Sequence, residues 1–271
     1  MVDYEAKQIG EVKGLGLIYQ VRAPLDKQIL SLIKVGAEMV SPEETAMIRI
    51  AEVSNDYTRT SMAPVAVKGE KPVLYKASPF MNPAMAKIAV NAHSNGKYPS
   101  FNREFYEVVK EIANTESSFE PEDRTAQILD SSEDYDLTPE MDDAKFILGK
   151  NTSEYFKKFG HSKINFLNLP VGGLPKDKCN VNYLWFNRPE NGSSINGRDR
   201  SLNNVNRAFG VRKSAEGAAK NSGYALTDIK NAIITAMPKS LEELGLSGLE
   251  NLKTTITGKL ESSILGILRK Q

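Results

Sequence analysis

Hydrophobic runs separated by short polar breaks mark the expected strands in the first third of the chain. Residues 14–23 and 29–36 are rich in aliphatic side chains and flank a Pro-Leu-Asp-Lys break, so they predict two strands joined by a turn. Residues 64–68 and 72–78 flank a Gly-Glu-Lys break in the same way and predict a second hairpin. The N-terminal part is therefore expected to contain β-hairpins.

Three segments in this third carry the start signals or the spacing of helices. In residues 41–55, Ser41 is the expected N-cap, a proline follows at the first helical position, and Glu44 completes a capping box. An Asn-Pro pair opens a helix over 84–93 that is expected to stop at the next Asn-Gly pair, and residues 102–114 place apolar side chains at helical spacing. Strands and helices are thus mixed.

The second half continues this mixture. Residues 138–149 and 153–160 predict short helices that each end at a glycine. Residues 164–171 and 180–186 predict strands, and the second alternates large apolar side chains on one face.

The last quarter has the pattern of amphipathic helices. Residues 225–237 place apolar side chains at helical spacing, and Ser240 with Glu243 forms the expected capping box of a final segment. That segment carries an apolar residue at nearly every third or fourth position, at Leu249, Leu252, Ile256, Leu260, Ile264 and Ile267. Such a stripe needs burial, either on its own domain or on a neighbouring subunit.

Charge divides the chain into three parts. Residues 1–110 hold 14 Lys/Arg against 12 Asp/Glu, residues 111–145 hold 2 against 12, and residues 146–271 hold 19 against 10. The middle part has few apolar residues, so we expect a mobile or extended acidic connector. The sequence therefore predicts a mixed α+β protein. Its expected parts are a mixed domain of β-hairpins and helices, the acidic connector, and a basic α+β domain ending in amphipathic helices.

Composition excludes several classes of protein. The 271 residues fit one large or two small domains, and 40% hydrophobic residues are enough for a core. No apolar run approaches the roughly 20 residues that span a bilayer, so no membrane partner is expected. One cysteine rules out an internal disulfide framework, and the polar N-terminus has no signal-peptide pattern. A cytoplasmic protein, of cellular or viral origin, is expected.

Catalytic and metal-binding motifs are not found. His93, His161 and Cys179 lie in unrelated contexts without neighbours at ligand or triad spacing. The acidic part resembles a calcium loop only at alternating positions and has Tyr135 where that loop requires glycine. A magnesium-dependent nuclease that uses the acidic part, with Asp143, Lys145 and upstream carboxylates around the metal, stays open as an alternative. The sequence otherwise favours a protein that is not an enzyme and holds no cofactor or metal.

Residues 185–213 are the most distinctive stretch, with an aromatic start, two Asn-Gly steps and several arginines and asparagines. We expect a loop over 188–200, then a helix from the N-cap Ser201 to a stop at Gly210. Arginine forks and amides suit phosphate oxygens and base edges, and an adjacent aromatic strand could stack on bases. The candidate nucleic-acid-binding residues are Trp185, Arg188, Arg198, Arg200, Asn203, Arg207, Arg212 and Lys213.

These patterns favour a non-enzymatic subunit of a nucleoprotein complex that binds RNA or single-stranded DNA. Its expected partners are nucleic acid and other protein subunits, including copies of itself. One alternative is a structural subunit of a viral, phage or other large assembly, in which acidic and basic regions pair between subunits. In another, the arginines of residues 185–213 bond carbonyl groups or the acidic part of the same chain or of a neighbouring chain.

Overall fold

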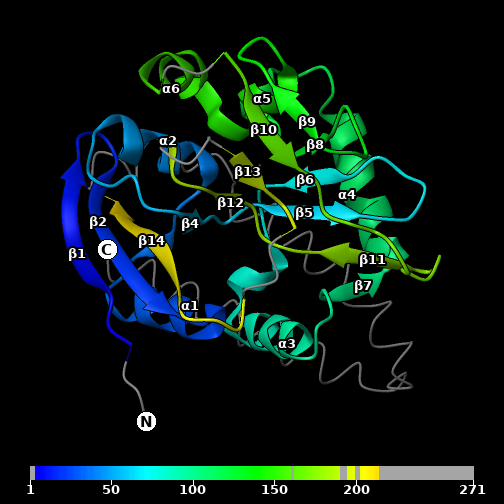
Figure 1. Cartoon of the computed structure of the whole chain (residues 1–271), viewed down its shortest axis with the longest axis horizontal. Helices are drawn as coiled ribbons and strands as arrows, with labels where there is room; N and C mark the ends of the chain where they lie inside the picture. The colour runs from blue at the N-terminus through cyan, green and yellow to red at the C-terminus, as the bar shows by residue number, and fades with distance from the viewer. Residues whose placement is uncertain (1–3, 160–161, 190–193, 199–201, 214–271) are drawn as a thin grey trace, which may run out of the picture. The chain divides into compact units, whose positions relative to one another are not determined.

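The computed structural model describes residues 4–159, 162–189, 194–198 and 202–213, which form two sheets with helices packed around them (Figure 1). The chain thus has the mixed α+β content that the sequence predicts. The helices expected beyond residue 213 lie outside the described residues. No helix in the described part is long and apolar enough to cross a bilayer.

The larger sheet has nine strands in the order β1-β2-β14-β4-β12-β13-β10-β9, and β3 also pairs with β14. Most neighbours are antiparallel, but β10 and β13 run parallel, as do β4 and β14. Its strands are β1 Lys7–Val12, β2 Gly16–Ala23, β3 Glu38–Met39, β4 Thr58–Arg59, β9 Tyr135–Leu137, β10 Ile164–Leu167, β12 Trp185–Phe186, β13 Ser194–Asn196 and β14 Asn206–Lys213.

The smaller sheet has five antiparallel strands in the order β7-β11-β5-β6-β8. They are β5 Ala63–Ala66, β6 Val73–Tyr75, β7 Ser100–Asn102, β8 Ala126–Ile128 and β11 Lys178–Val181. The pairing of β5 with β6 confirms the second predicted hairpin.

The α-helices are α1 Leu25–Lys34, α2 Pro42–Ile50, α3 Pro83–Ser94, α4 Arg103–Thr115, α5 Asp142–Leu148 and α6 Thr152–Lys158. Single 3₁₀ turns occupy Pro79–Met81, Pro121–Asp123 and Gly149–Asn151. The capping box of α2 is confirmed, since the Ser41 side chain accepts from the Glu44 amide and Glu44 accepts from the Ser41 amide. Helices α3 and α4 also lie where the sequence predicts them.

The strand expected over residues 29–36 is wrong, because most of this segment belongs to α1. Its buried residues Leu25, Ile29 and Leu32 recur at helical spacing and pack into the main hydrophobic core. Leu30 and Ile33 stay exposed on the other side. A dense aliphatic run does not by itself distinguish a buried strand from one face of a helix.

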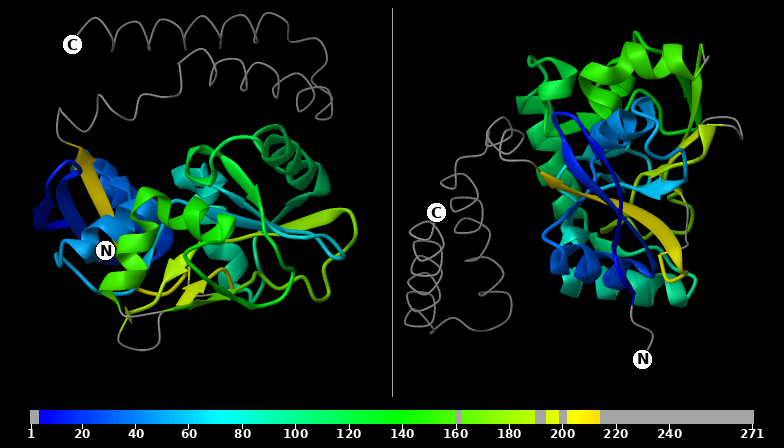
Figure 2. Two further views of the ribbon diagram at one scale, coloured as in Figure 1. Left: turned by 90° about the horizontal axis from the view of Figure 1, so that it is seen from above. Right: turned by 90° about the vertical axis from the view of Figure 1, so that its left-hand side faces the viewer.

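The helix expected from Ser201 to Gly210 is also wrong. Residues 202–205 form a turn, and every residue of β14 then pairs with β2, from Asn206 opposite Ala23 to Lys213 opposite Gly16. Figure 2 shows β14 (yellow) running beside β2 (blue). The apolar side chains expected on one helix face divide differently in the strand. Phe209 and Val211 point to one core and Ala208 to another, as the alternation of a buried strand requires.

The single strand expected over residues 180–186 is two strands in different sheets. β11 ends at Val181 in the smaller sheet and β12 begins at Trp185 in the larger sheet. All side chains from Val181 to Phe186 are buried, including Asn182 and Leu184. The expected alternation still holds, because Val181, Tyr183 and Trp185 share one hydrophobic core, whereas Leu184 and Phe186 belong to another.

The acidic residues 111–145 are folded and are not a connector. They contain the end of α4, β8 in the smaller sheet and β9 in the larger sheet, and Leu129 and Leu137 are fully buried. Strands from both sides of this segment build both sheets. The few apolar side chains of residues 111–145 are enough for this segment to fold, because its strands pair with strands from other parts of the chain.

Candidate functional site

Arg188 and Arg207 come together at one carboxylate. The Nη2 atom of Arg188 donates to Oδ1 of Asp56 at 2.6 Å, and the Nη1 atom of Arg207 lies 2.5 Å from the same oxygen. Arg188 follows β12, whereas Arg207 belongs to β14 and Asp56 precedes β4. Since β4 lies between β12 and β14 in the sheet, the pairing of these strands explains why the three residues meet.

A buried arginine holds the backbone of Asp56 in place. Arg49 of α2 is 1% exposed, and its Nη2 atom donates to the Asp56 carbonyl oxygen at 3.0 Å. The Asp56 amide donates to Oγ of Ser54 at 3.3 Å. The carboxylate itself remains partly exposed, and among the described residues its other oxygen accepts a single long contact, 3.5 Å from Nε2 of Gln20.

A third arginine stands beside this pair. Arg22 of β2 is exposed and lies directly opposite Arg207 in the β2–β14 pairing. Side chains that face each other across two strands are about 5 Å apart at Cβ, so the two like charges lie on the same face of the sheet. Two guanidinium groups therefore contact one carboxylate, and a third arginine lies on the same face of the sheet. A shallow hollow of about 250 Å³, lined by Ser54, Asn55, Asp56 and Arg188, opens at this point.

The aromatic ring at this surface belongs to Tyr57, and the stacking role expected for Trp185 is wrong. Trp185 is 2% exposed, and the Arg59 guanidinium lies 4.6 Å from its ring centre within the core. Tyr57 is only partly buried, and its ring centroid lies 6.4 Å from that of Trp185. The Arg207 guanidinium sits 5.8 Å from the Tyr57 ring centre. We name Gln20, Arg22, Asp56, Tyr57, Arg188 and Arg207 the Asp56 cluster.

The remaining candidates of residues 185–213 lie elsewhere. Arg198 forms an ion pair with Asp134 of the acidic segment, and its carbonyl oxygen accepts from the Tyr98 hydroxyl at 2.5 Å. This contact is the one predicted by the alternative in which the arginines bond the acidic part of the same chain. Asn203 is partly exposed in the turn before β14, and Arg200 lies outside the described residues.

The far end of β14 carries two more of the predicted residues. Arg212 is exposed and lies 5.5 Å over the Tyr19 ring, while Nζ of Lys213 is 3.7 Å from Oε1 of Glu44. Arg212 lies five positions after Arg207 in the strand, or about 17 Å away at the usual rise per residue. The structure therefore brings Arg188 and Arg207 together but not the other predicted residues.

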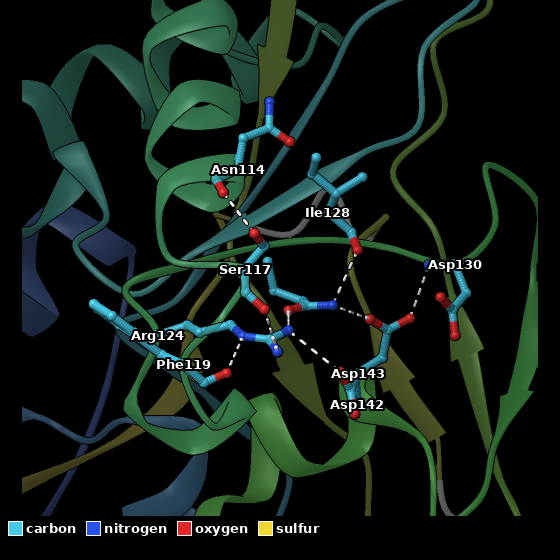
Figure 3. A network of polar contacts seen from close by, with 9 residues as sticks. Asn114, Ser117, Phe119, Arg124, Ile128, Asp130, Asp142 and Asp143 are labelled. Atoms are coloured by element: carbon cyan, nitrogen blue, oxygen red, sulfur yellow. Dashed lines mark hydrogen bonds and ion pairs between the residues drawn. The ribbon is translucent and has the colours of Figure 1, made fainter.

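The carboxylate of Asp143, the candidate metal ligand of the nuclease alternative, is fully buried in a hydrogen-bond network (Figure 3). It accepts from Nε2 of Gln127 at 3.1 Å, from the Asp130 amide at 2.9 Å and from the Tyr135 hydroxyl at 2.5 Å. Burial raises the pKa of this carboxyl above its ordinary value, against the effect of these donors. The neighbouring Asp142 pairs instead with Arg124 at the surface.

Two further candidate groups are also buried. His93 lies at the end of α3, with its ring 5.6 Å from that of Tyr98 in an edge-on contact. Cys179 of β11 is fully buried, and burial raises the pKa of its thiol. Within the described ranges, no three His, Cys, Asp or Glu side chains are grouped so that they could hold a metal ion. His161 lies outside those ranges.

Sequence reasoning missed four of the six residues of the Asp56 cluster, namely Gln20, Arg22, Asp56 and Tyr57. These residues lie more than 120 positions before Arg188 and carry no motif of their own. Only the strand order, with β4 between β12 and β14, places them beside the two arginines.

No protein-family model and no curated protein matches the chain. Among solved structures, the chain is similar to a protein from Nanoarchaeota described by the words "Accommodation of massive sequence variation in Nanoarchaeota by the C-type lectin fold". The two are 14% identical with a TM-score of 0.49, over 77% of this chain and 98% of the other. A likeness of this degree establishes neither a family nor a partner for this chain.

Proposed function

We propose that the chain is a non-enzymatic subunit that binds single-stranded nucleic acid, RNA or DNA, through the Asp56 cluster. The observation that carries this proposal is the convergence of Arg188 and Arg207 on a single, partly exposed carboxylate beside the exposed Arg22. One negative charge does not neutralise three positive ones. The surface therefore attracts anions, and the arginine fork matches the oxygens of a phosphate group.

Tyr57 supports a single-stranded ligand over a duplex. A partly exposed tyrosine beside phosphate-binding arginines offers a face on which an unpaired base can stack, and bases inside a duplex do not offer that face. Stacking tolerates every base, so we propose binding with little sequence preference. The wider role, as one of several subunits of a nucleoprotein complex in the cytoplasm that includes copies of this chain, is part of the same proposal.

The proposal is tested by fluorescence anisotropy with labelled twelve-nucleotide oligouridine and oligothymidine and a duplex of the same length. We expect binding of the single strands at low salt. The affinity should fall linearly with the logarithm of the salt concentration, because bound phosphates release counterions. Replacing both Arg188 and Arg207 by alanine should weaken binding by about 1–3 kcal/mol for each lost contact.

A matched control separates these contacts from net charge. Arg103 of α4 is partly exposed and is held in ion pairs with Glu70 and Glu107, as Arg188 and Arg207 are with Asp56. Each single replacement of Arg103, Arg188 or Arg207 by alanine removes one positive charge. An equal loss of affinity for all three variants, or no binding by the unmodified protein at 50 mM salt or below, would refute the proposal.

A further inference from the structure

We infer that the Asp56 carboxylate occupies the place of a ligand phosphate, so that nucleic acid binds by displacing it from Arg188 and Arg207. Asp56 then restrains binding as an internal competitor. The inference rests on the proposed function for the identity of the ligand. Its geometric basis, an anion held between two arginines, is independent of that identity.

The geometry of the two arginines requires an anion between them. Their terminal nitrogens lie 2.6 and 2.5 Å from the same Asp56 oxygen, so two like charges are held close together by one atom. Arg22 adds a third positive charge across the β2–β14 pairing. Without a negative group at this point the guanidinium groups would repel one another. An anion at this position, the carboxylate or a phosphate, therefore stabilises the observed arrangement of the two arginines.

The Asp56 carboxylate does not provide a hydrogen-bond acceptor for every N–H donor of the two arginines. Both arginines use Oδ1, whereas the described part of the chain offers Oδ2 no donor but Gln20, at 3.5 Å. The Nε atom of Arg207 is buried and has no hydrogen-bond acceptor among the described residues. A nucleic-acid phosphate has two charged oxygens, as a carboxylate has, but it is not tied to the Asp56 backbone, so each guanidinium group can bond to an oxygen of its own. A phosphate thus fits the donors better than Asp56 does.

Displacement of Asp56 requires little rearrangement of the fold. The side chains of Arg188, Asp56 and Arg207 are 42%, 24% and 20% exposed, so water reaches both ion pairs and the Arg188 pair is the weaker of the two. The Asp56 backbone stays in place because the buried Arg49 holds its carbonyl oxygen at 3.0 Å. Only the carboxylate has to turn away, and the hollow lined by Ser54, Asn55, Asp56 and Arg188 lies beside it.

The test is the Asp56→Asn substitution, which keeps the shape of the side chain and removes its charge. We expect the affinity for twelve-nucleotide oligouridine to rise about three- to tenfold at low salt, since the competitor is lost. The dependence of affinity on salt should also steepen by up to about one unit for each arginine set free, because these arginines now hold counterions until the ligand binds. A side chain with only a structural role would leave that slope unchanged.

Asp136→Asn is the matched control. The Asp136 carboxylate also pairs with a cation, Lys163 at 2.5 Å, and with an amide, Asn165 at 3.5 Å, and its loss changes the net charge by the same amount. We expect this variant to bind oligouridine like the unmodified protein. Should Asp56→Asn fail to fold, the carboxyl ¹³C resonance of Asp56 in the unmodified protein supplies the test. It should shift when oligouridine is added, while that of Asp136 stays constant.

The outcomes separate this inference from the proposed function. If the unmodified protein binds oligouridine and Asp56→Asn binds it equally or more weakly with the same salt slope, the inference fails and the proposed function stands. Inorganic pyrophosphate tests whether the site binds an anion that is not a nucleic acid. If neither protein binds oligouridine but pyrophosphate raises the melting temperature of Asp56→Asn more than that of the unmodified protein, the proposed function fails and the displaced-carboxylate site stands. If no anion distinguishes the two proteins, the inference is overturned.

Discussion

The guanidinium group of Arg49 donates a 2.7 Å hydrogen bond to the hydroxyl of Tyr155, 106 positions away in the sequence. Both side chains are buried, and the same guanidinium also reaches the carbonyl oxygens of Asp56 and Phe186. It lies 5.3 Å from the Phe186 ring centre as well. One arginine thus joins α2, α6, β12 and the loop that carries Asp56.

Tyr155→Phe should lower the free energy of unfolding by about 1–3 kcal/mol, because one donor of a buried guanidinium loses its acceptor. Urea unfolding followed by circular dichroism measures the change. Tyr98→Phe removes a hydroxyl whose hydrogen bond lies at the surface and should cost less. A Tyr155→Phe protein as stable as the unmodified one would show that Tyr155 does not support the Arg49 guanidinium.

Gly210→Ala should destabilise the protein by about 1–3 kcal/mol, because a Cβ at this position would lie 2.4 Å from Leu32 Cδ2 and 3.1 Å from the Glu38 carbonyl oxygen. The close approach of α1 and β3 to β14 requires a glycine here. Gly172→Ala is the control, since its Cβ would meet nothing within 4 Å, and it should change stability by less than about 0.5 kcal/mol. Equal thermal stability of the two variants would contradict the packing of α1 on β14.

Asp143 should make the protein less stable as pH rises above the acidic range. Burial raises the pKa of its carboxyl above the value of about 3.9 for an unfolded aspartate, so the folded protein keeps this proton to higher pH than the unfolded chain does. The contribution of Asp143 to the free energy of unfolding is therefore greatest below that value and decreases as pH rises through the raised pKa.

Asp143→Asn should flatten this decrease, because an amide does not titrate in this range. The NH₂ group of the asparagine would also point at a hydrogen-bond donor, because the Asp143 oxygens accept all their hydrogen bonds from donors. This mismatch should lower the free energy of unfolding by about 1–3 kcal/mol at every pH. Urea unfolding at a series of pH values from 4 upward measures both effects. An unchanged slope with pH would assign the dependence to another group, such as Glu44, whose pKa burial also raises.

Tyr57→Ala should weaken the binding of oligouridine by about 1–3 kcal/mol, as expected when one stacked base loses its platform. Tyr57→Phe keeps the ring and loses only the 3.4 Å contact of the hydroxyl with Asn206, so its affinity should stay close to that of the unmodified protein. Anisotropy titrations of the two variants decide the point. Equal affinities for Tyr57→Ala and Tyr57→Phe would remove the stacking role.

Local signals predicted the elements whose ends they define. The capping box of α2 and the Asn-Pro start of α3 are formed by neighbouring residues, so they are readable without knowledge of the rest of the fold. The same holds for the hairpin of β5 and β6. The apolar spacing of residues 29–36 and 201–210 fits both the period of a helix and that of a strand. Only contacts with distant parts of the chain decide which of the two forms.

For the same reason, only two of the six residues of the Asp56 cluster could be predicted. Composition pointed to Arg188 and Arg207, since arginines stand out in residues 185–213. Their partner Asp56 lies 132 positions before Arg188, and a single aspartate in a loop carries no signal. Trp185 was assigned to stacking although aromatic residues are as common in a core as at a binding surface, and the structure buries it.

The place of β14 has a consequence for the chain during its synthesis. β14 is inserted between β2 and β4, and Gln28 beside β2 bonds to the carbonyl oxygen of Asn206 across 178 positions. The pair of β1 and β2 therefore leaves the ribosome with one edge of β2 unpaired, and this edge stays open until β14 has been synthesised. An open edge of this kind is a template for wrong pairing between nascent chains. Slow translation or crowded polysomes should thus favour aggregation through β2 before the sheet is closed.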